Sequence, residues 1–428
     1  MQQEKQIKKI IFPKKIVSSS ITLKRNAKLF GIAHQLPSSK SISNRALILQ
    51  ALGGNQANVS NLSAARDTKL MKALIGSSDK MIDVLDAGTT MRFLTAYFAI
   101  TNQQKILTGT SRMKQRPIGL LVEALQKIGA DIDYTETVGF PPVEVKGFKK
   151  QVASQLEISG NVSSQYISAL MMVAPLLPSG LTIRLVGQIG SVPYIEMTAS
   201  LMKDFGAAVN LDWSTHTIQV LPGKYGLANV TVEADWSAAS YWFAFVALAQ
   251  EAELTLPNIT QQSLQGDRVI VDIMEKIGVQ SRFEGHTLQL KKTAASRHLT
   301  WDFTHCPDLA QTVLPVCAAK GITGTFTGME SLRIKETDRL EALSIELKKI
   351  GAELTEPQTG NWKLTPGNVS KLTSPIETYH DHRMAMGFAP WATLTDVTIL
   401  SPEVVNKSYP GFWEDVRSVG IEVQSKRL

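Results

Sequence analysis

The stretch LVEALQKIGADIDY at residues 121–134 decides the fold, because its pattern recurs along the chain. Apolar residues fall at helical spacing, and Gly129 ends the helix before a short β-like run. The pattern returns, most weakly in its first copy, at 68–78, 197–211, 270–283, 339–354 and 412–423. After the first interval the closing glycines are spaced by roughly 70–77 residues, so one whole supersecondary unit repeats.

A second set of helices follows the same period and is apolar on nearly all sides. These helices are predicted at 39–52, 87–100, 163–177, 236–249, 306–319 and 381–394. A helix that lacks a polar face is buried. Because β-rich runs lie between the helices, each unit is predicted as a strand, a buried helix, a strand, an amphipathic helix and closing strands.

Six such units favour an α/β protein of two domains, each with three units, in which the buried helices lie inside and the sheets outside. The boundary in the middle of the chain is expected near Val232–Asp235. The first unit is short between Arg66 and Asp83, so one or two of its closing strands are expected to be missing.

The composition narrows the class of protein. The 428 residues are 43% hydrophobic and 19% charged, which excludes disordered and fibrous proteins. Neither a membrane span nor a signal peptide is expected. Two cysteines, Cys306 and Cys317, exclude a disulfide framework, so a cytoplasmic location is expected. A net charge of +7 does not by itself indicate nucleic acid, and the basic cluster at 8–15 is expected to be a solvated tail.

Polar residues open the buried helices, and a helix N-terminus attracts anions. These openings are Ser38–Ser41, Gly88–Thr90, Ser163–Gln165 and Asp381–Arg383. Serine, threonine and aspartate are also ordinary N-caps, but capping does not explain Lys40, Arg45 or Arg383 beside them. Charged loops at 112–117, 335–339 and 406–410 precede amphipathic helices; a run such as KETDR alone is more often a solvated helix start.

Nine motifs together give a resemblance to a known family. They are LPSSKSISNRA (36–46), DAGTTMRF (86–93), RMKQRPIG (112–119), VSSQYISAL (162–170), SVPYIE (191–196), PDLAQT (307–312), RIKETDRL (333–340), DHRMAM (381–386) and NKSYPGFW (406–413). In these motifs the chain resembles the 5-enolpyruvylshikimate-3-phosphate synthases of the enolpyruvyl transferase family. The match spans nearly the whole chain, and KETDR with DHRMAM makes it specific.

The resemblance implies two inside-out α/β domains, each with three βαβαββ units. Residues 1–35 are then expected to join 235–428 in one discontinuous domain, and 36–234 to form the domain inserted between them. The active site is expected in the interdomain cleft, which closes over its ligands.

The resemblance also implies transfer of the enolpyruvyl group of phosphoenolpyruvate to the 5-hydroxyl of shikimate-3-phosphate, with release of phosphate, in the shikimate pathway to aromatic amino acids. Two phosphates and two carboxylates bring about six negative charges into one cleft, which requires matched cations. Since lysine and arginine supply them, no metal and no cofactor is expected. The family further implies a monomer, with no nucleic acid or membrane partner.

Residue roles follow from the same resemblance. Phosphoenolpyruvate is expected to bind Lys40, Gly88, Arg116, Gln165, Arg339, Arg383 and Lys407. Shikimate-3-phosphate is expected to bind Lys40, Ser41, Arg45, Ser163, Ser164, Gln165, Ser191, Asp308, Ser331 and Lys335, with Tyr194 nearby. Asp308 is the expected base toward the hydroxyl, Glu336 the proton donor and acceptor at the methylene carbon, and Lys40 the group that stabilises departing phosphate. Asp308 could instead cap the helix that follows it. His382 is expected to orient rather than to bind metal.

Several residues depart from the family pattern. Asp86 stands where the family usually has Asn beside the incoming phosphate, and its charge should weaken anion binding unless it is paired. Ser331 replaces a usual Asn, Phe93 replaces a common Pro, and the first loop has PSSKS in place of PGSKS. Because 163–165 resemble the glyphosate-sensitive class, inhibition by this phosphoenolpyruvate mimic is predicted.

Two alternatives remain open at this stage. UDP-N-acetylglucosamine enolpyruvyl transferase shares the fold and donor but generally uses a reactive cysteine, and the loop at 112–117 has none. A non-enzymatic anion-binding or nucleic-acid-binding protein would use the positive charge but leaves Asp308 and Glu336 unexplained, and the basic residues are not interleaved with aromatic ones.

Overall fold

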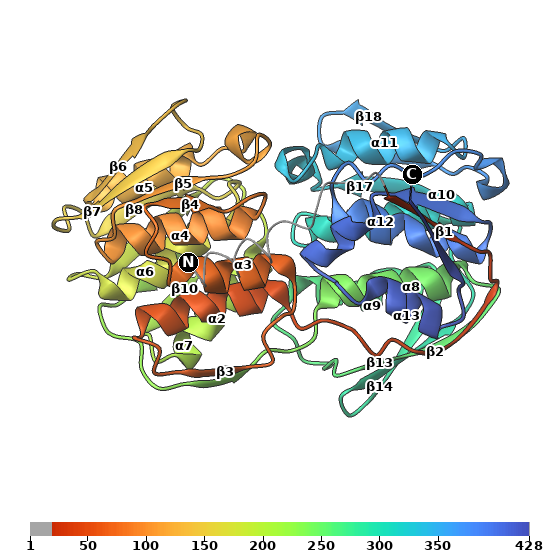
Figure 1. Ribbon diagram of the computed structural model, residues 1–428, viewed down its shortest axis with the longest axis horizontal. Coiled ribbons are helices and arrows are strands. Elements are labelled where there is room, and N and C mark those ends of the chain that lie inside the picture. The colour runs from red at the N-terminus through yellow and green to blue at the C-terminus, as the bar shows by residue number, and fades with distance from the viewer. Residues whose placement is uncertain (1–18, 428) are drawn as a thin grey trace.

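The computed structural model describes residues 19–427, and these form two lobes side by side (Figure 1). The inserted lobe has a hydrophobic core drawn from residues between Ile42 and Val232. The terminal lobe has a separate core from residues 21–33 and 234–421. The basic cluster at 8–15, like all of 1–18, lies outside the described residues.

Two βαβαββ units of the inserted lobe are complete. The first contains β4 (Met81–Asp83), α4 (Gly88–Ile100), β5 (Lys105–Thr108), α5 (Gly119–Ile128), β6 (Ala130–Tyr134) and β7 (Val143–Phe148). The second contains β8 (Gln155–Ser159), α6 (Ser164–Val173), β9 (Leu181–Val186), α7 (Val192–Asp204), β10 (Val209–Asp212) and β11 (Thr217–Val220). Their strand orders are β4-β5-β7-β6 and β8-β9-β11-β10, with the first two strands parallel in each sheet.

The remaining unit of this lobe, which is the first along the chain, is abbreviated, as the sequence predicts. It consists of α2 (Lys40–Leu52), β3 (Asn58–Ser60) and α3 (Arg66–Ile75), and β3 pairs in parallel with β12 (Asn229–Thr231). The next strand after α3 is β4, which belongs to the following sheet. Strand β12 therefore brings the end of the lobe back beside its beginning.

The terminal lobe repeats the same scheme with help from the start of the described chain. Its strands are β1 (Ser19–Leu23), β2 (Lys28–Ile32), β13 (Glu251–Pro257), β14 (Val279–Glu284), β15 (Thr287–Lys292), β16 (His298–Asp302), β17 (Thr323–Thr327), β18 (Glu353–Gln358), β19 (Asn361–Thr365), β20 (Val397–Leu400) and β21 (Val423–Arg427). Its helices are α8 (Trp236–Leu248), α9 (Ile270–Lys276), α10 (Ala310–Lys320), α11 (Arg339–Lys348), α12 (His382–Phe388) and α13 (Phe412–Ser418). The sheets have the orders β14-β15-β13-β2, β16-β17-β19-β18 and β20-β1-β21. Strand β1 thus lies between two strands from the opposite end of the chain.

The chain passes between the lobes twice, at one place. The Ser39 N–H donates to the Glu233 carbonyl at 2.8 Å, and the Asp235 N–H donates to the Pro37 carbonyl at 2.8 Å. The two crossing segments are therefore hydrogen-bonded to one another, and helices α2 and α8 begin directly after them.

The predicted fold class is confirmed, with differences at helix ends. In α8 every residue except Ser237 is buried, as its apolar sequence predicts. Helix α6 ends at Val173 and α12 at Phe388, each followed by a 3-10 turn that contains a proline, Pro175 or Pro390. A proline cannot donate the next helical hydrogen bond, so both predicted helices were too long. The helix predicted from Cys306 begins as a 3-10 turn at Pro307 and becomes α-helical at Ala310.

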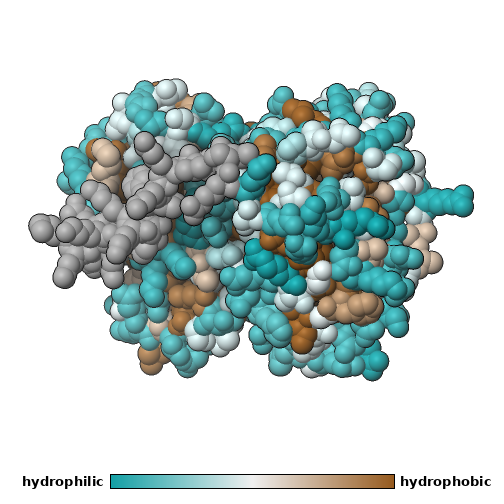
Figure 2. Space-filling view, turned by 45° about the vertical axis from the view of Figure 1, so that its right-hand side comes forward, coloured by the Kyte–Doolittle hydropathy of each residue, from teal (hydrophilic) through white to brown (hydrophobic). Residues whose placement is uncertain are grey.

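Hydrophilic residues cover most of the face shown in Figure 2, and apolar residues appear between them. None of the helices described between residues 19 and 427 combines the length and the apolar character needed to cross a membrane.

Candidate active site

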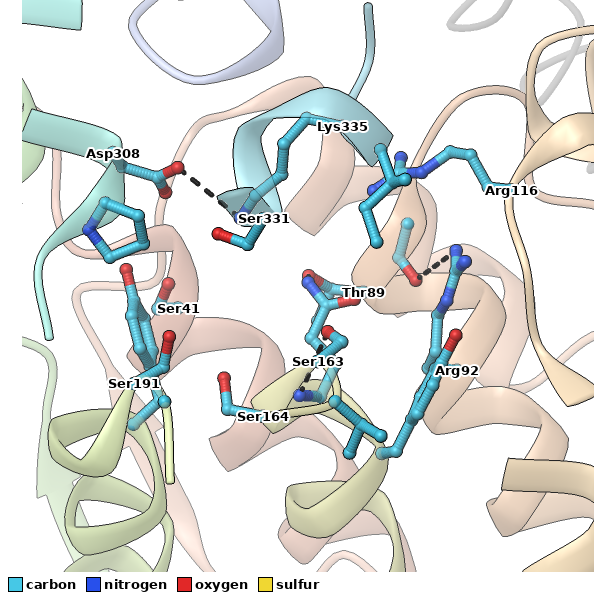
Figure 3. A pocket seen from close by; sticks show the side chains of 18 of the residues that line it. Ser41, Thr89, Arg92, Arg116, Ser163, Ser164, Ser191, Asp308, Ser331 and Lys335 are labelled. Atoms are coloured by element: carbon cyan, nitrogen blue, oxygen red, sulfur yellow. Dashed lines mark hydrogen bonds and ion pairs between the residues drawn. The ribbon is translucent and has the colours of Figure 1, made fainter. Parts of the chain in front are cut away.

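A cleft of about 620 Å³ is lined by residues of both lobes. Every predicted site residue lines it except Lys407. In Figure 3 the hydroxyls of Ser41, Ser163 and Ser191 from the inserted lobe lie across the cleft from Asp308 and Lys335 of the terminal lobe. The cleft therefore brings the two halves of the predicted site together.

Helix N-termini form much of the wall from the inserted lobe. Ser39 caps α2 by accepting from the Ile42 N–H, and Ser163 caps α6 by accepting from the Gln165 N–H. The capping interpretation is therefore right for these two serines. The residues that follow each cap, such as Lys40 and Ser164, line the cleft. Capping and an anion-binding opening coexist, because the cap fixes the turn that carries the ligating side chains.

Arg116 is a buried cation that forms no ion pair in the described chain, although it lies close enough to Glu336 to help lower the pKa of that carboxyl. Its side chain packs on Gly88, where an added Cβ would lie 2.7 Å from both Nη atoms. Arg116 is only 7% exposed, and its Nε and Nη1 have no hydrogen-bond partner among the described residues. Since an unpaired buried charge is costly, this position requires an anion.

Arg45 is a second buried cation in this wall. It donates to Thr198 Oγ1 at 2.7 Å and to Ser168 Oγ at 3.1 Å, both neutral groups. Its guanidinium lies 5.3 Å from the centre of the Phe93 ring and 5.7 Å from that of Tyr194, at cation–π distance. Burial lowers the pKa of Arg45 to about 10. Phe93, which departs from the family pattern, thus packs against a predicted carboxylate-binding residue.

On the terminal-lobe wall, Asp308 lies among three cations. Its carboxylate accepts from Arg339 at 2.7 Å and from Arg383 at 3.0 Å, and Lys335 Nζ lies 3.5 Å away. Burial alone would raise the pKa of Asp308, but these three cations hold it well below its usual range. In the described structure α10 has no side-chain cap, so the capping alternative for Asp308 is wrong.

Glu336 is held in the same network. It accepts from Arg339 Nη2 at 3.0 Å, and its other oxygen lies 3.1 Å from Lys407 Nζ. Burial would raise the pKa of Glu336, but Lys407, Arg339 and Arg116 hold it well below its usual range. Since one guanidinium joins Asp308 and Glu336, the two candidate proton-transfer groups are neighbours, and KETDR is not a solvated helix start.

Asp381 holds Arg339 and Arg383 in place through hydrogen bonds. It accepts from Arg339 Nε at 2.6 Å and from the Arg383 N–H at 2.9 Å, where it caps α12. His382 is buried beside it, and burial, Lys40 and Arg383 hold its pKa well below the usual value, so the ring is neutral. Within residues 19–427 no cluster of three histidine, cysteine or acidic side chains could hold a metal ion.

Lys407 lies behind the wall and joins the lobes. Its Nζ is 3.0 Å from Asp86 Oδ2 and 3.1 Å from the Asp86 carbonyl oxygen, while Arg66 pairs with Asp86 Oδ1. Burial would raise the pKa of Asp86, but Lys407 and Arg66 lower it to about 2. The unusual charge at this position is therefore paired.

Sequence reasoning missed several groups that support these side chains. Asp67 lies 3.4 Å from Lys40 Nζ, Arg92 lines the cleft, and Ser237 links Arg383 to the buried Asp267. The acid–base pair Arg66–Asp67 at a helix start was the available signal for Asp67. Asp267 had none, because only the fold brings the 3-10 turn at Gly266–Val269 close to Ser237 and Arg383.

Both cysteines are buried, and burial raises the pKa of Cys306 and that of Cys317 to about 12 each. Neither residue lines the cleft. A reactive thiol of the kind that UDP-N-acetylglucosamine enolpyruvyl transferases generally use has no counterpart among the residues around this cleft.

Comparison with known proteins identifies the relatives. Residues 75–416 match the family model described as EPSP synthase (3-phosphoshikimate 1-carboxyvinyltransferase). A protein named 3-phosphoshikimate 1-carboxyvinyltransferase from Bacteroides fragilis is 46% identical over 394 residues, covering 91% of this chain and 95% of that protein. One of the same name from Mannheimia haemolytica is 36% identical, covering 90% and 96%. A solved structure of EPSP synthase from Acinetobacter baumannii has a TM-score of 0.72 at 20% identity, covering 96% of this chain and all of that one, and so supports the fold.

Proposed function

The chain belongs to the EPSP synthase family, and we propose that it transfers the enolpyruvyl group of phosphoenolpyruvate to the 5-hydroxyl of shikimate-3-phosphate with release of phosphate. One observation carries the proposal: Asp308 and Glu336, joined by Arg339, line the same cleft as the buried Arg116, whose Nε and Nη1 have no hydrogen-bond partner among the described residues. The relatives bear the name of this activity and not that of the UDP-N-acetylglucosamine enzyme.

The donor subsite uses cations from both lobes. Arg339 and Arg383 bind the carboxylate of phosphoenolpyruvate, because a guanidinium matches a planar carboxylate. The phosphate binds Lys40, Arg116, Gln165, Lys407 and the Gly88 N–H. In the described structure Arg339 and Arg383 are held by Asp308 and Asp381, so the bound donor must share or replace these partners.

The acceptor subsite lies mainly on the inserted lobe. Ser41 and Arg45 bind the carboxylate of shikimate-3-phosphate, and Ser163, Ser164, Ser191 and Lys335 bind its phosphate beside Tyr194. Ser331 lies near the hydroxyl groups of the bound shikimate-3-phosphate. Ser191 has a left-handed backbone (φ 55°), and its N–H donates to the Thr304 carbonyl at 3.0 Å, so both lobes fix this serine.

The reaction proceeds by addition and then elimination. Asp308 takes the proton of the 5-hydroxyl as its oxygen bonds to C2 of the donor, and Glu336 gives a proton to C3, which becomes a methyl group. In the second stage Glu336 removes a proton from that methyl group, the C2–O bond to phosphate breaks, and Lys40 stabilises the departing phosphate. Each proton that enters at C3 is thus balanced by one that leaves, and the hydroxyl proton taken by Asp308 is released to the departing phosphate or to water, so both carboxyls return to their starting states.

Binding of the donor prepares Glu336 to carry a proton. Without ligand, Lys407, Arg339 and Arg116 lower the pKa of Glu336 against the effect of burial. The donor's anionic groups neutralise these cations, while the burial of Glu336 remains. The pKa of Glu336 therefore rises when phosphoenolpyruvate binds, and the carboxyl can then serve as an acid.

The separate cores support the domain division expected from the sequence. We assign 36–234 to the inserted domain and 235–428 with the segment before residue 36 to the other; of that segment the structure describes 19–35. The protein acts without metal or cofactor, as a cytoplasmic monomer, and is inhibited by glyphosate. Family resemblance supports these last properties, and a glyphosate inhibition constant far above the KM for phosphoenolpyruvate would refute the inhibition.

Phosphate release from phosphoenolpyruvate, in excess chelator, tests the activity. We expect release with shikimate-3-phosphate and none with UDP-N-acetylglucosamine. Release only with UDP-N-acetylglucosamine would support enolpyruvyl transfer but would make that compound the acceptor. If folded protein releases no phosphate with either acceptor, the result would contradict the proposed activity and favour a binding protein.

A further inference from the structure

Three protein oxygens surround the ammonium group of Lys407. It is 2% exposed, and its Nζ contacts the Asp86 carbonyl, the Asp86 carboxylate and Glu336, each at 3.0–3.1 Å. A lysine ammonium has three N–H donors. Asp86 accepts from two of them, and the Glu336 carboxylate forms an ion pair with Nζ at 3.1 Å, so a phosphate that reaches this buried group must displace one of these three oxygens.

Asp86 is the partner that can leave. Glu336 is needed for proton transfer at C3 in the proposed reaction, and the Asp86 carbonyl is fixed in the backbone just before α4. The Asp86 carboxylate, by contrast, already has a second cation: its Oδ1 pairs with Arg66 Nη2 while its Oδ2 pairs with Lys407. It is also more exposed than Glu336, at 27% against 13%. Losing Lys407 would therefore leave Asp86 charged but still paired.

Asp86 and Gly88 lie two residues apart, so the carboxylate reaches Lys407 from beside the phosphate subsite. We propose that Asp86 sets the affinity of that subsite for phosphate: its carboxylate pairs with both Lys407 and Arg66 while the subsite is empty and retains only Arg66 when a phosphate dianion binds. This inference rests on the proposed function. It means that Asp86 weakens the binding of donor phosphate and of product phosphate alike, and that Arg66 limits the penalty by holding the displaced carboxylate.

The first test is Asp86→Asn in the full-length enzyme. Removal of one negative charge beside a phosphate should lower the KM for phosphoenolpyruvate and the inhibition constant of inorganic phosphate together, by roughly fivefold. The value of kcat should change much less. A residue with only a structural role would not tighten binding when altered, so an unchanged or raised pair of constants would overturn the inference.

The second test asks whether Arg66 acts through Asp86. Arg66→Gln should raise the KM for phosphoenolpyruvate several-fold in the wild-type background, because the displaced carboxylate then has no second cation. In the Asp86→Asn background the same change should have a clearly smaller effect. Equal effects in both backgrounds would show that Arg66 merely attracts the anion, and would overturn the proposed exchange.

Two measurements keep this inference distinct from the proposed function. Asp133→Asn removes an exposed, paired carboxylate from β6 of the same lobe and should leave both constants unchanged. Calorimetric titration with inorganic phosphate alone reports on the subsite without turnover. If Asp86→Asn binds phosphate more tightly but the protein shows no enolpyruvyl transfer, the inference about the phosphate subsite stands and the proposed function is rejected. If the protein shows transfer but Asp86→Asn does not bind phosphate more tightly, the proposed function stands and the inference about Asp86 is rejected.

Discussion

The two walls of the cleft hold their charges in opposite ways. On the inserted lobe, Arg45 and Arg116 pair with no carboxylate in the described chain and lie among hydroxyls and helix N-termini. On the terminal lobe, every cation that faces the reaction is already paired: Lys335 and Arg383 with Asp308, and Arg339 also with Glu336.

This difference separates binding from chemistry. At Arg45 and Arg116 the inserted-lobe wall can accept an anion without breaking an ion pair, whereas Lys40 of the same wall is paired with Asp67. The cations of the terminal-lobe wall are already paired with carboxylates of the same wall, so an anionic ligand must replace or share these carboxylates. Under the proposed function that exchange would change the charge around Asp308 and Glu336, so we assign proton transfer to the wall whose charges respond to substrate.

The largest expected effect belongs to the terminal-lobe wall. Glu336→Gln should lower kcat by about 10²–10⁴-fold, the usual contribution of a general acid–base group, and leave both KM values within a few-fold. Steady-state phosphate release measures this. Glu330→Gln, which alters another carboxylate of the cleft, is the matched control and should be near wild type. A loss expressed mainly in KM would assign Glu336 to binding.

Arg116→Ala tests the inserted-lobe wall. Because charge-assisted hydrogen bonds contribute about 1.5–3 kcal/mol, the KM for phosphoenolpyruvate should rise by about 10- to 100-fold. The effect on kcat should be smaller than that of Glu336→Gln. Arg184→Ala, which breaks an exposed ion pair with Glu157, is the control. If Arg116→Ala lowers kcat as much as Glu336→Gln does, the division between the walls fails.

Gly88→Ala should produce a milder version of the Arg116 defect. The new methyl group would meet both Nη atoms at 2.7 Å, and the flexible guanidinium would have to move. We expect a rise of about 3- to 10-fold in the KM for phosphoenolpyruvate, since the cation is displaced and not removed. The KM for shikimate-3-phosphate should stay near wild type, and a larger change in that constant would argue against displacement of Arg116.

Alkylation of thiols should have no effect. Cys306 and Cys317 are buried with raised pKa values, so neither forms an appreciable thiolate at pH 8. Activity after incubation of the native enzyme with iodoacetamide at that pH should equal that of the untreated enzyme. Inactivation that substrate prevents would instead place a reactive thiol at the site.

The sequence predicted what is local and repeated. Helical periodicity located the six buried helices, and polar helix openings with the family motifs located the residues of the cleft. Contacts between distant residues had no such signal. Strand β1 pairs with β20 and β21 from the far end of the chain. Asp86 and Lys407 meet across the two lobes although they are 321 positions apart. Asp308 resembled a helix cap because its three cations come from other segments.

Hydrogen exchange at the methylene carbon of the donor tests the central claim most directly. Turnover in D₂O with both substrates should place deuterium at C3, because the methyl group formed from the addition loses any one of its hydrogens. Glu336→Gln should bind both substrates, as shown by titration calorimetry, and incorporate deuterium at least about 10²-fold more slowly. Incorporation at the wild-type rate by this variant would contradict the assignment of proton transfer to the terminal-lobe wall.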